Sequence, residues 1–137
     1  MSEFVANTLE VVAALWGTTS SEWPPTVILN PEQVKGTETM FNLHDVRPDA
    51  VPGRIAAIVR DQGATEVVFA APWMAPGLFG GQSVMAAHMT PEAVETFTAR
   101  LKPGPANLWR VGRWKHVANA SAPIPEVQAA LREAAGR

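Results

Sequence analysis

The sequence predicts a single α/β domain, with a single-layer mixed sheet of about four to five strands packed against three to four helices. Three observations lead to this prediction. The chain has 137 residues, the size of one ordinary domain. Apolar residues make up 47% and charged residues 18%, as in a globular protein. Short β-branched or apolar runs also alternate with segments of helical periodicity. An α+β arrangement stays open as the alternative.

The first predicted helix spans residues 2–16. Ser2 is an N-cap candidate, and Gly17 follows the last apolar residue of the pattern as a stop signal. The apolar residues recur at 3.6-residue spacing, which predicts that one face of the helix is buried. The residues of that face are Phe4, Val5, Leu9, Val12, Leu15 and Trp16. We expect the polar stretch 18–25 to be an internal linker within one domain, 1–137.

Two further helices are predicted, over residues 50–62 and 124–135. Asp49 is the N-cap candidate of the first, and Gly63 follows it as a stop signal. The inward faces are expected to hold Val51, Ile55, Ile58, Val59, Gln62, Val127, Ala130 and Leu131.

Strands are predicted near residues 26–30, 38–44, 65–71 and 107–117. Residues 26–30 are rich in β-branched side chains, and residues 38–44 alternate as a half-buried strand does. Residues 65–71 form a continuous apolar run, which is typical of a central strand covered on both faces.

Residues 90–101 fit two structures. Thr90, Pro91 and Glu92 form a helix start, with an N-cap, Pro at the first helical position and an acid in the first turn. The alternative is a strand that turns at 102–105 into a hairpin. We favour the helix.

Charge is distributed unevenly along the chain, although the net charge is only −2. Residues 1–50 carry two basic and seven acidic residues, whereas residues 100–137 carry seven and two. Such asymmetry can indicate a face that binds nucleic acid or an acidic partner. The simpler interpretation is that folding brings the two ends together and their charges neutralise one another.

Several kinds of chemistry are excluded or unsupported by the residue types. The chain has no Cys, which excludes disulfides, thiol nucleophiles and Cys–zinc sites. His44, His88 and His116 do not have the spacing of metal ligands, and no phosphate-binding glycine motif is present. We therefore expect no metal and no cofactor. Because no targeting or membrane-spanning segment is visible, we expect a cytoplasmic protein.

The stretch 72–89 is the first candidate for function, because residues 67–91 contain no Asp, Glu, Lys or Arg. We interpret 72–89 as a Gly/Pro-rich loop whose apolar side chains need covering. One alternative is that the loop folds back on the domain's own core. The favoured function is a non-enzymatic interaction protein that associates with itself or with a protein partner. The expected partner-binding residues are Trp73, Met74, Leu78, Phe79 and Met85.

The basic stretch 100–116 is the second candidate, as a site for RNA or single-stranded nucleic acid. Its candidate residues are Trp109, Arg110, Arg113, Trp114 and Lys115. In a regular strand, alternation would place one Trp and some of the cations on each face. The alternative is an edge strand that buries one Trp in the core and is protected by its cations.

The third candidate is Gly80-Gly81-Gln82, which is followed by Ser83. This tripeptide resembles the one in peptide-chain release factors, where in one branch of the family a Ser also follows it. With Ser83 included, the match covers four residues of 137. The resemblance implies a peptidyl-tRNA hydrolase-like activity in which Gln82 positions the attacking water. Leu78 and Phe79 stand where that family tends to have polar or basic residues.

Residues 63–74, with the helix before them, resemble a segment of small uncharacterised bacterial α/β proteins. The resemblance covers about a quarter of the chain and implies a helix–strand pair without an assigned function.

Overall fold

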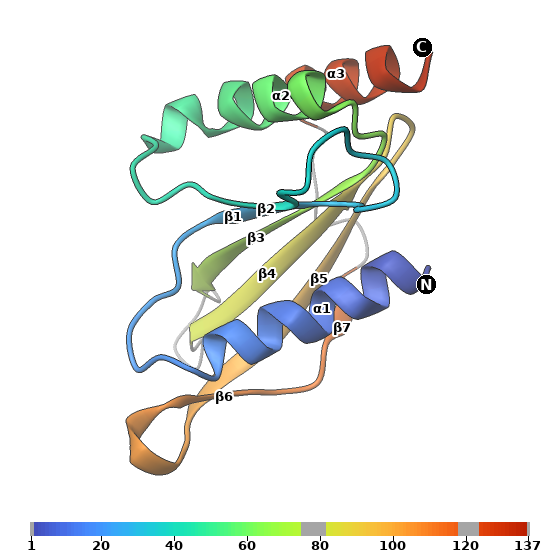
Figure 1. Ribbon diagram of the computed structural model, residues 1–137. Helices are drawn as coiled ribbons and strands as arrows, with labels where there is room; N and C mark the ends of the chain where they lie inside the picture. Colours follow the sequence, from blue (N-terminus) through green and yellow to red (C-terminus); the bar gives the residue numbers. More distant parts are fainter. Residues whose placement is uncertain (1, 75–81, 118–123, 137) are drawn as a thin grey trace.

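The structure is a computed structural model that describes residues 2–74, 82–117 and 124–136 (Figure 1). In these residues the chain forms three α-helices and a seven-stranded sheet. The strand order is β2-β1-β3-β4-β5-β6, β7 also pairs with β5, and every pair is antiparallel. The sheet curls into a half-barrel, and because it is antiparallel throughout and packs against helices, the fold class is α+β.

The predicted mixed sheet is therefore wrong. A helical crossover does connect β2 (Met40–Asn42) to β3 (Val67–Met74), and these two strands run in the same direction. However, β1 (Thr26–Leu29) lies between them and is antiparallel to both. No parallel pair forms because the crossover passes over one strand.

The three predicted helices are confirmed as α1 (Glu3–Trp16), α2 (Val51–Gln62) and α3 (Pro125–Ala135). The Ser2 hydroxyl oxygen accepts a hydrogen bond from the Val5 N–H, as expected of an N-cap. Gly63 ends α2 with a φ of 75°, the left-handed conformation that favours glycine.

The prediction that Asp49 caps α2 is wrong. Asp49 lies within a short 3-10 helix, Pro48–Ala50, that precedes α2, and Ala50 occupies the cap position without a side-chain hydrogen bond. The Val51 N–H, the first of α2, donates instead to the Pro48 carbonyl, so the backbone of the 3-10 turn takes over the role of the cap.

Most of the predicted loop 72–89 is a β-hairpin. Residues 72–74 continue β3, and residues 82–89 are β4 (Gln82–Met89), paired from Val67↔Met89 to Met74↔Gln82. β4 also pairs with β5 on its other side. The absence of charged residues from β4 is therefore typical of a central strand. Only 75–81, which include Leu78, Phe79 and the two glycines of the tripeptide, lie outside the described residues.

The favoured helix over 90–101 is also wrong, because these residues lead into β5 (Val94–Pro103). The Ala93 N–H donates to the Thr90 hydroxyl oxygen at 3.1 Å, and the Thr90 N–H donates to the Ala93 carbonyl at 2.9 Å. The Thr side chain that resembles a helix cap thus closes the β4–β5 turn. The alternative of a strand and hairpin is the one that the structure supports.

The predicted strand 107–117 is divided into β6 (Trp109–Val111) and β7 (Lys115–Val117), after a 3-10 turn at Pro105–Asn107. Both strands pair with β5, with the registers Leu101↔Val111 and Thr98↔Lys115. From Thr98 to Leu101, β5 advances by three residues, whereas the opposite segment advances by four, from Val111 to Lys115. The extra residue is a β-bulge, which changes the face on which later side chains lie.

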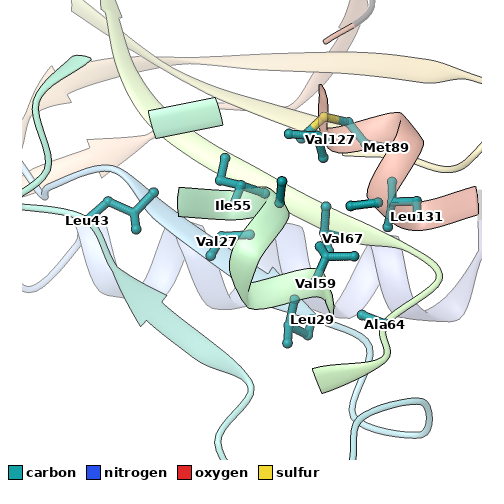
Figure 2. Close-up of a cluster of buried hydrophobic side chains, with 12 residues drawn as sticks. Val27, Leu29, Leu43, Ile55, Val59, Ala64, Val67, Met89, Val127 and Leu131 are labelled. Atoms are coloured by element: carbon teal, nitrogen blue, oxygen red, sulfur yellow. The ribbon is translucent and has the colours of Figure 1, made fainter. Parts of the chain in front are cut away.

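Helices cover both faces of the sheet (Figure 1). The α1 layer packs on one face and includes Val5, Leu9, Val12, Trp16, Ile28, Val68, Ala70, Val84, Ala86, Phe97, Ala99 and Leu101. The α2–α3 layer packs on the other face, where Figure 2 shows side chains of both helices meeting β1, β3 and Met89. Successive residues of β1 and β3 enter opposite layers, as alternation along a strand requires. Among the described helices, none has the length and hydropathy to cross a membrane.

Candidate functional site

A groove of about 550 Å³ lies between α1 and the edge of the sheet formed by β1 and β2. Phe4 and Val11 come from the helix, and Ile28 and Met40 from the two strands. Val11 is 45% exposed and Met40 is 40% exposed, which makes them two of the three exposed large apolar residues in the described part of the chain. The groove therefore contains apolar surface that the fold itself leaves uncovered.

Carboxylates accompany this apolar surface. Glu3, Glu32 and Glu66 line the groove, and no Lys or Arg is among the described residues that line it. The other lining residues are Ser2, Asn7, Thr8, Leu29, Asn30, Pro31 and Thr39. The site combines an apolar surface with negative charge, which suits a ligand that is partly apolar and positively charged.

Glu66, one of the carboxylates of the groove, contacts two side chains. Asn30 Nδ2 donates to Glu66 Oε1 at 2.8 Å, and His88 Nε2 lies 2.8 Å from Glu66 Oε2. The His88 ring contacts Phe4 edge-on, with ring centroids 6.3 Å apart. The side chains of His88 and Glu66 are 13% and 20% exposed. Asn30, the residue after β1, and His88 on β4 thus fix the position of this carboxylate beside the groove, and Phe4 of α1 packs against the His88 ring.

Replacing Glu66 with alanine is expected to lower the free energy of unfolding by about 1–3 kcal/mol, because the Asn30 amide and the His88 ring lose a shared partner. Urea denaturation measures this change. Glu92→Ala is the control, since Glu92 is exposed in the β4–β5 turn, and it should change stability by less than about 0.5 kcal/mol. Equal effects of the two substitutions would show that the Glu66 network contributes nothing.

The three histidines have separate surroundings. His88 contacts Glu66, the His116 ring packs edge-on against Phe97 with a centroid separation of 5.4 Å, and His44 Nδ1 lies 2.9 Å from Asn42 Oδ1. Within the described ranges, no three His, Asp or Glu side chains are placed to hold a metal ion.

The tryptophans of the predicted nucleic-acid site belong to the α1 layer. Trp109 and Trp114 are half-buried against it, together with Val12 and Trp16. Trp109 Nε1 donates to the Ser21 carbonyl at 3.1 Å, and Trp114 Nε1 is buried with no hydrogen-bond acceptor among the residues that the structure describes. The prediction that each face carries one Trp is wrong, because the bulge at 112–114 brings both rings to the α1 side.

The same bulge gathers cations on the opposite face. Lys102 pairs with Arg110 across β5 and β6, and Lys115 pairs with Thr98. Arg100 lies between Thr98 and Lys102 on the same side of β5. We call the four cations on this side the basic face: Arg100, Lys102, Arg110 and Lys115. All four are exposed, as is Arg113 in the bulge.

The predicted partner-binding and release-factor-like residues are only partly described. Met85 is half-buried in β4, and positions 73 and 74 are the last two of β3. Gln82, half-buried, begins β4 and lies one residue before Ser83, which is opposite Arg100. Alternation therefore places Gln82 and Arg100 on different faces of the sheet. This placement does not favour a site in which Gln82 works beside the basic face.

The sequence did not indicate the groove, since its residues come from four separate segments: 2–11, 28–32, 39–40 and 66. One signal was available. Val11 is apolar but lies outside the predicted inward face of its helix, and such a residue indicates surface that could be covered by a partner.

Comparisons with known proteins do not assign a family. No family model matches the chain, and neither the curated proteins nor the solved structures contain a significant match. Function is therefore inferred from the groove and the basic face.

Proposed function

We propose that the protein is a non-enzymatic binding module, and that it holds a basic, partly apolar segment of another protein in the groove between α1 and the β1–β2 edge. The observation that carries this proposal is the coincidence of exposed apolar side chains with carboxylates in one groove. Val11 and Met40 would lose contact with water when a partner binds. Glu3 and Glu32 would attract the partner's Lys or Arg residues.

The edge of the sheet favours an extended partner. The Leu29 N–H donates to the Thr39 carbonyl at 2.8 Å, and Phe41 is in register with Val27. In an antiparallel ladder, main-chain groups alternate between the two sides of a strand, so those of Met40 point away from β1. β2 ends the strand order of the sheet, and an added strand could form hydrogen bonds with these groups.

The two hydroxyl groups on the α1 side of the groove, those of Ser2 and Thr8, support binding rather than catalysis. The Ser2 oxygen accepts the Val5 N–H, and the Thr8 hydroxyl donates to the Phe4 carbonyl at 2.7 Å. Both groups thus stabilise α1, and neither has a neighbouring base that would activate it as a nucleophile among the contacts of the described residues.

Selection from a displayed library of random heptapeptides tests the proposal. We expect enrichment of Lys or Arg beside Leu, Ile, Val or Met. For the best peptide, Met40→Lys should weaken binding at least about tenfold, equivalent to about 1.4 kcal/mol, because it adds a cation to the apolar floor.

Leu108→Lys is the matched control. Leu108 is 37% exposed and lies outside the groove, so this variant should bind the peptide as the wild type does. Acidic selected peptides, or equal weakening by the two substitutions, would contradict the proposal.

A further inference from the structure

We propose that the basic face, formed by Arg100, Lys102, Arg110 and Lys115, binds the phosphate backbone of a nucleic acid. This inference is independent of the groove, because the four cations lie on the side of the sheet opposite α1. It also differs from the stacking site expected from the sequence, since both tryptophans of that segment pack into the α1 layer.

The placement of Lys102 opposite Arg110 is unfavourable in the free protein. Lys102 and Arg110 are directly opposite each other on neighbouring antiparallel strands, and like charges in such positions destabilise a sheet. Residues 98–117 contain no Asp or Glu. Lys102, Arg110 and Lys115 form no ion pair with an acidic residue that the structure describes. A bound polyanion would relieve this repulsion.

The spacing of the cations suits a chain of phosphates. Arg100 and Lys102 are two residues apart on β5, which is about 6.8 Å along an antiparallel strand. Arg110 extends the array onto β6 and Lys115 onto β7. The cations therefore form a two-dimensional array, which fits repeated phosphate contacts better than a single anion.

A nucleic acid is favoured over a lipid surface. Membrane-surface binding combines cations with apolar side chains that enter the interface. In the described part of the chain the exposed large apolar residues are Val11, Met40 and Leu108, and the first two lie in the groove on the other side of the sheet. Leu108 alone gives little apolar surface for insertion.

Fluorescence anisotropy with one labelled 20-nucleotide sequence, prepared as single-stranded RNA, single-stranded DNA and duplex DNA, measures the binding. Four phosphate contacts predict a slope of log Kobs against log salt of about −3 for a single strand. Between about 50 and 200 mM salt, affinity should fall roughly 50-fold. Little dependence on base sequence is expected because the contacts are to the backbone.

The double variant Lys102→Glu/Arg110→Glu should bind at least about tenfold more weakly at the lowest salt. Its slope of log Kobs against log salt should be shallower by about 1.4, because two phosphate contacts are lost. The control is Arg54→Glu/Arg132→Glu, which makes the same change in net charge at exposed positions on α2 and α3. It should alter affinity by less than about threefold, since distant exposed charges are screened.

Lys102→Glu alone separates binding from folding. It places a carboxylate opposite Arg110, so the urea midpoint should rise while nucleic-acid affinity falls. A loss of binding that followed a lower midpoint would contradict the proposal. So would absence of binding to all three oligonucleotides at low salt, equal effects of the two double variants, or binding to anionic phosphatidylserine vesicles in place of the oligonucleotides.

Discussion

Replacing Trp16 with alanine is expected to lower the free energy of unfolding by about 3–5 kcal/mol. Trp16 is 2% exposed in the last turn of α1, where it belongs to the cluster that includes Ile28 and Leu101. Removing the indole leaves a cavity between the helix and the sheet, and the surrounding strands can fill only part of it. Urea denaturation followed by circular dichroism measures the change.

Val11→Ala provides the control on the same helix. Val11 is 45% exposed, so its truncation should change stability by less than about 0.5 kcal/mol. In Trp16→Ala, amide hydrogen exchange should increase more in α1 than in α2 or α3, because the cavity lies in the α1 layer. If the two substitutions had equal effects, α1 would not be docked through Trp16.

The helices could be predicted because their signals are local. Ser2 and Gly63 act at the ends of α1 and α2 through contacts within a few residues, and the inward faces follow a regular period. The buried residues of α3 include Val127, Ala130 and Leu131, all of which were expected to face inward.

The strands were harder to predict because local signals serve more than one structure. Thr90 has the sequence features of a helix cap, yet its hydroxyl closes a hairpin turn. The period-2 pattern of β5 is fixed by partners on both sides, β4 on one and β6 and β7 on the other. β4 and β6 are joined to β5 by short turns, and β7 lies farther along the chain. The residues of β5 alone do not reveal that all three strands pair with it.

The candidate sites depend on features that a single sequence hides. The bulge between Val111 and Lys115 is one extra residue relative to β5, and it moves Trp114 to the side that Trp109 already occupies. Simple alternation along residues 107–117 cannot reveal that shift. The groove likewise requires knowing that α1 lies beside β2, two elements separated by more than 20 residues.

Leu131→Ala is expected to lower the free energy of unfolding by about 2–5 kcal/mol. Leu131 is fully buried in the α2–α3 layer, in the cluster that contains Val59 and Val67 (Figure 2). Ala129→Gln, on the exposed side of α3, is the control and should change stability by less than about 0.5 kcal/mol, because Gln is also a good helix former.

The pattern of hydrogen exchange should be the reverse of that in Trp16→Ala. Leu131 and Trp16 lie on opposite faces of the sheet and belong to different clusters. Leu131→Ala should therefore increase exchange in α2 and α3 more than in α1. A uniform increase across all three helices in both variants would contradict this expectation, because Trp16 and Leu131 would then stabilise one cooperative unit rather than two layers that can open separately.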